Sequence, residues 1–166
     1  MPGPVFLDGD PVALHTITED DYDFLVENRN RPAVRHGIAQ SEPTSREEYR
    51  EMIEEGEDDV AFLPCVDGEP VGYVWAFHIN DVSRNALLGY WIAEDHQGKG
   101  YGTAMVDRMV EWAFRDRGLH KLWAHVIEHN DASRRVLEKN GFAHEGVLRE
   151  QFWVEGEFAD VDSFGL

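Results

Sequence analysis

The run EDHQGKGYGTAM, residues 94–105, contains the residues of this chain that are best suited to hold an anion. Gly98, Gly100 and Gly102 alternate with other residues, and Lys99 adds a positive charge just before a predicted helix. Glycines allow unusual backbone dihedrals and close approach of a ligand, while the free N–H groups and dipole of a helix N-terminus favour negative charge. The run therefore predicts a phosphate-binding turn; the alternative is a tight turn with a surface lysine.

The spacing of these glycines excludes two common nucleotide-binding motifs. A P-loop requires a glycine five residues before Gly98 and Ser or Thr after Lys99, but the chain has Ala93 and Gly100 at these positions. A dinucleotide-binding fingerprint has the spacing G-x-G-x-x-G, whereas this run has G-x-G-x-G. The predicted anion therefore belongs to another class of ligand.

Two segments resemble the GCN5-related N-acetyltransferase (GNAT) superfamily. Residues 97–102, QGKGYG, match its [QR]-x-x-G-x-[GA] pyrophosphate loop. Residues 130–150, NDASRRVLEKNGFAHEGVLRE, resemble the N-x-x-S-x-x-x-x-x-K-x-G-F-x-x-E-G block of the branch that includes the Rim-type ribosomal-protein N-terminal acetyltransferases. The resemblance implies an α/β fold with a mixed sheet, GNAT-like, in which the fourth and fifth strands splay apart to hold acetyl-CoA.

The same resemblance implies how acetyl-CoA would be bound. Backbone groups of Tyr90, Trp91 and Ile92 would meet the pantetheine arm and the acetyl carbonyl. Asn130 would hydrogen-bond the pantetheine region, and Ser133 would lie near the thioester sulfur. The pyrophosphate would be held by Gln97, Gly98, Lys99, Gly100, Tyr101, Gly102 and Thr103.

Direct acetyl transfer requires a neutral amine, a polarised thioester carbonyl and a proton for the departing thiolate. We expect the backbone N–H of Ile92, at the splayed end of the fourth strand, to stabilise the oxyanion. Ser133 is the predicted proton donor; the alternative is that its side chain only caps the helix that starts near Asp131. Many family members carry a tyrosine acid seven residues after the asparagine, where this chain has Leu137.

The predicted general base is Glu150, in the strand that follows the E-G block. His125, on the fifth strand, and Glu94 are the alternatives, each able to act through water. His125 and His129 do not predict a metal site, because no third ligand lies at a suitable spacing.

These residues must be positioned by a series of strands and helices. The predicted elements are a strand over 11–17, helices over 18–30 and 44–56, strands over 60–66, 70–79 and 86–92, a helix from the glycine run to Gly118, a strand over 121–127, a helix over 131–141, and a hairpin of 142–154 and 157–166. The order β-α-α-β-β-β-α-β-α-β-β has no long linker. It predicts a single N-acetyltransferase domain over residues 1–166, with helices on both faces of a mixed sheet.

Capping signals and apolar residues support the first two predicted helices. Thr18 begins the first helix, and Thr44 or Ser45 with Glu48 begins the second. The predicted inward stripe of the second helix is Tyr49, Met52 and Ile53. The tryptophans are expected in the core, except that Trp91 and Trp153, with Tyr90, are candidates for lining the acceptor pocket.

The chain is strongly acidic: among 166 residues, Lys and Arg number 15 against 33 Asp and Glu, for a formal net charge of −18. Such a surface repels nucleic acid and anionic lipid, so neither is an expected partner. The lysines are only Lys99, Lys121 and Lys139, which favours a halophilic protein over an ordinary acidic cytosolic one. With a single cysteine, Cys65, no signal peptide and no membrane-length apolar run, we expect a cytoplasmic protein.

These observations predict an acetyl-CoA-dependent N-acetyltransferase without a metal, either monomeric or homodimeric. The favoured acceptor is a protein N-terminal α-amine, whose pKa of about 7.7–8.0 demands less of a base than the value of about 10.4 for lysine. An acidic surface also suits a basic acceptor such as a ribosomal-protein tail. The alternatives are a small amine, of the polyamine or antibiotic-like kind, and a non-catalytic acyl-CoA-binding module.

Overall fold

The computed structural model describes residues 1–56 and 60–166. Within these residues, nine strands form one sheet. Their spatial order is β1 (Val5–Leu7), β2 (Ala13–His15), β3 (Val60–Val66), β5 (Gly72–Asn80), β6 (Asn85–Ile92), β7 (Lys121–Ile127), β9 (Glu157–Gly165) and β8 (Ala143–Val154), with β4 (Glu69–Pro70) paired to β3. Neighbouring strands run antiparallel, except that β6 and β7 are parallel.

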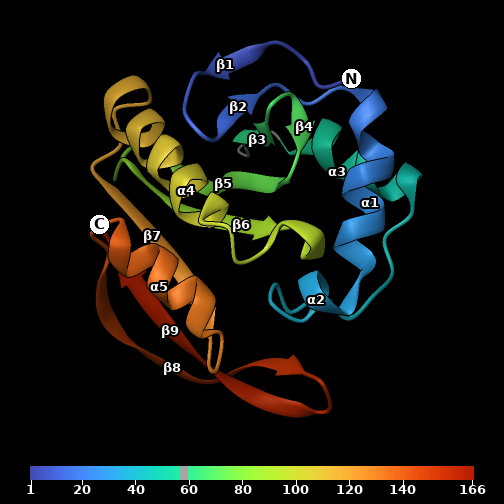
Figure 1. Cartoon of the computed structure of the whole chain (residues 1–166). Helices are drawn as coiled ribbons and strands as arrows, with labels where there is room; N and C mark the ends of the chain where they lie inside the picture. Colours follow the sequence, from blue (N-terminus) through green and yellow to red (C-terminus); the bar gives the residue numbers. More distant parts are fainter. Residues whose placement is uncertain (57–59) are drawn as a thin grey trace.

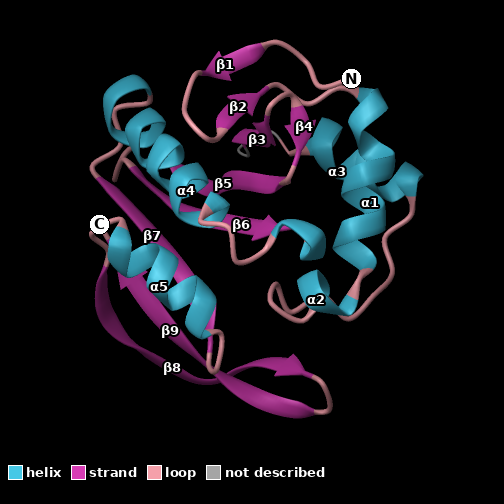
Figure 2. Cartoon of the chain, viewed as in Figure 1, coloured by secondary structure: helices cyan, strands magenta, loops and turns pink. Residues whose placement is uncertain are grey.

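Helices cover both faces of the sheet (Figures 1 and 2). One face carries α1 (Tyr22–Asn30), α2 (Pro32–Arg35) and α3 (Arg46–Glu55), which share an apolar cluster with the central strands. The other carries α4 (Tyr101–Glu111), which continues as a π-helical turn (Trp112–Asp116), and α5 (Asp131–Lys139), in a second cluster. No helix of the described residues is both long and apolar enough to cross a bilayer.

Strand alternation explains the two apolar clusters. Successive residues of a strand point to opposite faces of its sheet. In β6, Leu88 belongs to the cluster under α4 and α5, whereas Trp91 belongs to the cluster under α1, α2 and α3. In β5, Val74 belongs to the cluster under α4 and α5, and Tyr73 belongs to the cluster under α1, α2 and α3. Both faces of these strands are therefore apolar because helices cover both.

β6 and β7 separate partway along their length. They pair only where Asn85–Leu87 runs beside Lys121–Trp123. Beyond these residues β6 stays paired with β5 as far as Ile92, and β7 stays paired with β9 as far as Ile127. The resulting V confirms the predicted splay of the fourth and fifth strands, which are β6 and β7 in this structure.

The predicted order of elements is confirmed, and among the described residues the structure adds two short strands, one short α-helix and two 3₁₀ turns. β1, β4 and α2 have three, two and four residues, which is too few for a periodic hydrophobic pattern to appear. Thr18 begins a 3₁₀ turn (Glu19–Asp21) that leads into α1, rather than α1 itself.

The second predicted helix, α3, begins as its capping signal indicated. Ser45, rather than Thr44, is the cap, and its Oγ accepts a hydrogen bond from the N–H of Glu48 at 3.2 Å. The inward stripe is narrower than predicted: Tyr49 is fully buried, but Met52 is 39% exposed. The reason is that α3 packs mainly against α1, so a single ridge of its surface is covered.

Candidate functional site

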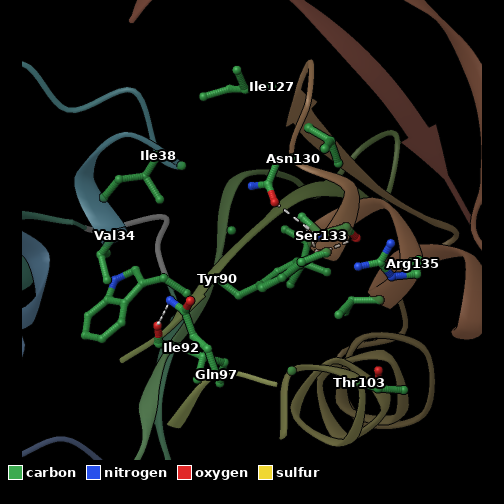
Figure 3. Close-up of a pocket in the computed structure, with 18 of the residues that line it drawn as sticks. Val34, Ile38, Tyr90, Ile92, Gln97, Thr103, Ile127, Asn130, Ser133 and Arg135 are labelled. Atoms are coloured by element: carbon green, nitrogen blue, oxygen red, sulfur yellow. Dashed lines mark hydrogen bonds between the residues drawn. The ribbon is translucent and has the colours of Figure 1, made fainter. Parts of the chain in front are cut away.

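A cavity of about 560 Å³ lies at the V between β6 and β7. Its walls come from α2, β5, β6, the start of α4, β7, α5 and β8, and Figure 3 labels lining residues of α2, β6, α4, β7 and α5. The predicted donor-binding residues that line it are Tyr90, Trp91, Ile92, Gln97, Gly98, Gly100, Tyr101, Gly102, Thr103, Asn130 and Ser133. Lys99 is exposed and lies outside this lining. The fold thus brings the two segments that carried the family resemblance to one place.

The glycine loop, residues 97–102, uses its glycines for two purposes. Gly98 (φ 74°) and Gly100 (φ 81°) adopt the left-handed backbone conformation that other residues rarely take. Gly100 is also the N-cap of α4. A Cβ at Gly102 would lie 3.2 Å from Cγ2 of Val136 in α5. The first two glycines therefore shape the turn, and the third lets α4 and α5 pack closely.

Side-chain amides hold this loop in place. Gln97 Nε2 donates to the carbonyl oxygen of Ile92 at 3.0 Å and so ties the loop to the end of β6 (Figure 3). Asn140 Nδ2 donates to the carbonyl oxygens of Thr103, at 3.2 Å, and Val136, at 2.9 Å. The start of α4, whose first N–H groups have no partner within the helix, is therefore fixed beside α5.

The charge of the cavity differs from that of the whole molecule. Arg135 and Lys139 of α5 line it, and Arg135 lies on the same side as Thr103 (Figure 3). None of its described lining residues is Asp or Glu, although the chain contains 33 of them. Two cations and a helix N-terminus favour an anionic ligand at this side of the cavity.

Ser133, in the first turn of α5, contacts the phenol of Tyr90. Ser133 Oγ and Tyr90 Oη are 2.7 Å apart, and Oη lies 3.2 Å from the carbonyl oxygen of Ser133. Burial raises the pKa of Tyr90, so its phenol stays protonated. Asn130 is the cap of α5, and its Oδ1 accepts from the N–H of Ser133 at 3.2 Å. The alternative in which the Ser133 side chain only caps this helix is therefore wrong.

The backbone N–H of Ile92 points toward the V. The N–H of the next residue, Ala93, donates to the carbonyl oxygen of Val71 at 2.9 Å, on the β5 side. Backbone groups of successive residues alternate between the two edges of a strand, so the N–H of Ile92 faces away from β5. Because the ladder with β7 has already ended at Leu87, this N–H faces the opening.

His125 is a candidate base that lines the cavity. It lies on β7 beside Trp123, with 5.4 Å between the two ring centroids. Its Nε2 is buried and has no hydrogen-bond partner among the described residues. Burial lowers the pKa of His125, which keeps the imidazole neutral and able to accept a proton near neutral pH.

The other two candidate bases lie outside the cavity lining. Glu150 is exposed at an irregularity of β8, with φ 51°, and its N–H donates to Asp160 Oδ1 at 2.8 Å. Glu94 is exposed in a 3₁₀ turn (Glu94–His96) before the glycine loop. Sequence spacing could not separate these residues from His125, because the path of a hairpin relative to the V is a tertiary feature.

Several cavity residues carry no motif and were missed in the sequence. Trp75 and Phe77 line the cavity from β5. Val34 and Ile38 line it on the α2 side, across from Asn130 (Figure 3). The two-residue spacing of the β5 aromatics was a usable signal, because residues two apart in a strand share a face.

Trp153 is not part of the cavity lining, which corrects its prediction as an acceptor-pocket residue. Its side chain is 55% exposed and packs edge-on against Phe158, at the closed end of the β8–β9 hairpin. The hairpin register places this pair next to the turn, beyond the part of β9 that pairs with β7. In the described residues, no three His, Cys, Asp or Glu side chains gather in a metal-binding group.

Comparison with known proteins identifies relatives of this chain. Residues 12–143 match the family described as "Acetyltransferase (GNAT) domain". Spermidine N(1)-acetyltransferase of Vibrio cholerae is 35% identical over 91 residues, which are 55% of this chain and 53% of that protein. YdaF of Bacillus subtilis, named as a candidate ribosomal N-acetyltransferase, is 29% identical over 87% of this chain and 82% of that protein. The chain thus spans about half the length of the first relative and most of the second.

A solved structure is similar over almost the whole chain. The crystal structure of spermidine N-acetyltransferase from Vibrio cholerae in complex with CoA and spermine has a TM-score of 0.89 at 26% identity, and the match covers 95% of this chain and 96% of that one. The sheet and its two helical layers are therefore an architecture shared with an acetyltransferase whose crystal contains CoA.

Proposed function

The chain belongs to the GNAT family of acetyltransferases, and we propose that it transfers the acetyl group of acetyl-CoA directly to a primary amine. The observation that carries this proposal is the glycine loop, which begins α4 beside the V between β6 and β7. Two left-handed glycines, a helix N-terminus and the cations of α5 converge there on one cavity. This arrangement suits a pyrophosphate at the helix and a thioester in the V.

In this proposal the donor lies along three elements. Its pyrophosphate contacts the backbone of residues 97–103, and Arg135 and Lys139 supply the positive charge that the sequence suggested for Lys99. The pantetheine arm follows residues 90–92 of β6 and meets the amide of Asn130. All of these residues except Lys99 line the one cavity, which supports the assignment.

The transfer itself is proposed to use three groups at the V. The N–H of Ile92 donates to the thioester carbonyl oxygen as negative charge develops on it. His125 Nε2 accepts the proton that the amine loses as the C–N bond forms. Ser133 Oγ–H donates to the sulfur as the C–S bond breaks. The amine loses one proton to His125 and the thiolate gains one from Ser133; exchange with water then returns a proton to Ser133 and removes the one on His125, so the step balances without an oxidant or reductant.

The base in this proposal is His125 rather than Glu150. His125 lines the cavity and carries a buried, unpaired ring nitrogen among the described residues, whereas Glu150 is exposed and outside the lining. A neutral imidazole suffices for an amine whose own pKa is close to neutral pH.

The acceptor we favour is therefore a protein N-terminal α-amine, with a pKa of about 7.7–8.0. The relative YdaF is named as a candidate ribosomal N-acetyltransferase, which supports a protein as the acceptor. A polyamine is the second candidate, because the Vibrio cholerae relative is a spermidine acetyltransferase and its solved structure contains spermine.

Acetyl-CoA and a panel of N-terminal peptides and polyamines test this function. Free thiol release is followed by absorbance, and acetyl-CoA binding is measured separately by calorimetry. The proposal expects thiol release that depends on the amine. Tight binding of acetyl-CoA without thiol release for any amine would instead support a non-catalytic acyl-CoA-binding module.

A further inference from the structure

The alternation of side chains along the central strands divides the cavity into two halves. Cross-strand partners point to the same face of a sheet. Phe77 is opposite Leu87 in the β5–β6 ladder, and Leu87 is opposite Trp123 in the β6–β7 ladder. His125 follows Trp123 by two residues, so it lies on the same face.

The half on the α4 and α5 side is the donor half, where Tyr90 and Ile92 pack. The half on the opposite face, on the side of α1 and α2, is the acceptor half. Its floor and sides are formed by Trp75, Phe77, Leu87, Trp91, His125 and Ile127.

The floor of the acceptor half is the indole of Trp75, which lies over Gly89 of β6. Trp75 is opposite Gly89, and a Cβ at Gly89 would lie 2.3 Å from Cζ2 and 2.4 Å from Cε2 of the Trp75 ring. Any side chain at position 89 would therefore displace the indole. Because Gly89 has no side chain, the Trp75 indole can lie over it and line the cavity.

The walls of the acceptor half are apolar as well. Figure 3 shows Val34 and Ile38 across the cavity from Asn130, with Ile127 above them. Phe152 of β8 adds a further aromatic ring to the lining. Within the described lining no carboxylate is available to pair with a second or third ammonium group of an acceptor.

Two polar atoms of the acceptor half lack partners in the described part of the chain. One is His125 Nε2, and the other is Nε1 of Trp91, whose side chain is only 5% exposed. An indole N–H can only donate, and a buried donor without an acceptor is unfavourable. A ligand that brings a carbonyl oxygen close to its amine would satisfy Trp91 and leave the amine for His125.

We propose that the acceptor half receives the N-terminus of a peptide whose first residue has an apolar side chain. The amine faces His125, the first carbonyl accepts from Trp91 Nε1–H, and the side chain packs on Trp75 and Phe77. This inference rests on the proposed acetyltransferase function. It selects against polyamines, which bring several charges and no carbonyl.

Matched acceptors test the proposal. Two peptides that differ only in the first residue, Leu or Asp, are compared with spermidine by thiol release from acetyl-CoA. The Leu peptide is expected to have a kcat/KM at least about tenfold above both, because one apolar contact already discriminates by that order. Equal or higher kcat/KM for spermidine or the Asp peptide would overturn the inference while leaving acetyl transfer established.

Two tryptophan variants separate the role of the Trp91 indole N–H in peptide binding from a general effect on the fold. Trp91→Phe keeps an aromatic side chain but removes the indole N–H together with the pyrrole ring, so we expect the KM for the Leu peptide to rise several-fold. The kcat/KM for 2-phenylethylamine, which has no carbonyl to accept from the indole, should fall by a smaller factor than that for the Leu peptide. Trp153→Phe, at the exposed hairpin end, is the matched control and should change none of these.

An unchanged peptide KM in Trp91→Phe would overturn the role of the indole N–H. A loss that is equal for the peptide and 2-phenylethylamine would overturn it too, since the ring alone would then matter. If acetyl-CoA binds but no amine is acetylated, the proposed function fails rather than this inference.

Discussion

At the scale of single residues, the contact between Tyr90 and Ser133 bears on which hydroxyl would face the thioester in the proposed transfer. Tyr90 Oη has one proton and two acceptors within reach, Ser133 Oγ at 2.7 Å and the Ser133 carbonyl oxygen at 3.2 Å. When the phenol donates to Oγ, the Ser133 proton is free to point at the sulfur. Tyr90 is then a positioning residue, in a chain that has Leu137 where many relatives have a tyrosine acid.

Tyr90→Phe tests this arrangement because it removes the hydroxyl and keeps the ring. A hydrogen bond contributes about 0.5–1.5 kcal/mol, so kcat should fall by up to about tenfold while the KM for acetyl-CoA stays constant. Ser133→Ala should lower kcat by about 100-fold. If Tyr90 acts through Ser133, the double variant will be no slower than Ser133→Ala; additive losses would mean that the two act independently.

His125 and Glu150 differ in burial, so as candidate bases they predict different pH profiles. His125→Gln should lower kcat/KM by about 100-fold, whereas Glu150→Gln should leave it near the wild-type value. Burial lowers the pKa of His125, so its contribution is lost only as pH falls below the usual histidine range of about 6.5. The wild-type rate profile should show this acidic limb and His125→Gln should lack it. The opposite ranking of the two variants would return the role to Glu150.

At the scale of elements, the turn between β6 and α4 combines shape and charge. Gly98 and Gly100 set its left-handed backbone, and Gly102 allows α4 and α5 to pack closely. The two helices are further joined through Asn140, which hydrogen-bonds both of them. A pyrophosphate site at this turn therefore depends on the packing of α5 as well as on the loop sequence.

Gly100→Asp should abolish acetyl-CoA binding, because it places a negative charge where the pyrophosphate is proposed to sit. The left-handed backbone at φ 81° adds a stability cost of about 1 kcal/mol. Gly118→Asp is the matched control, since Gly118 has φ 70°, open space around it and no part in the cavity lining. Calorimetry should show loss of binding in the first variant alone; loss in both would point to a general effect on the fold.

At the scale of the whole molecule, the acidic side chains that give the net charge of −18 lie outside the described lining of the cavity. The described lining holds Arg135 and Lys139 but no carboxylate, so acidic residues are concentrated elsewhere on the protein. This division allows an anionic donor to bind inside a strongly acidic protein. The halophilic character and the choice between monomer and homodimer stay predictions.

Salt should stabilise this protein, since screening weakens its self-repulsion. Raising KCl from 0.1 to 1 M shortens the Debye length from about 10 to about 3 Å. We expect the melting temperature to rise by about 2–4 °C or more, as followed by calorimetry. The increase should largely disappear near the isoelectric point of about 4.6, where the net charge vanishes. A melting temperature that does not change with salt at pH 7 would argue against the halophilic prediction.

The sequence by itself determined the order of elements, the family, and the turn that begins α4. These features are local: capping residues, two-residue and helical periodicities, and a contiguous glycine motif are all visible along a single chain. It could not show β1 or α2, which are too short for a period, nor that Ser133 and Tyr90 meet across 43 positions.

Only the tertiary structure decided which candidate residues share the cavity. It placed His125 inside and left Glu150, Lys99 and Trp153 outside. It also brought together the proposed acceptor half from α2 and four strands, with an indole lying over Gly89. Which faces meet is set by strand register and by where β6 and β7 separate, and both depend on pairing between distant segments rather than on any local run of residues.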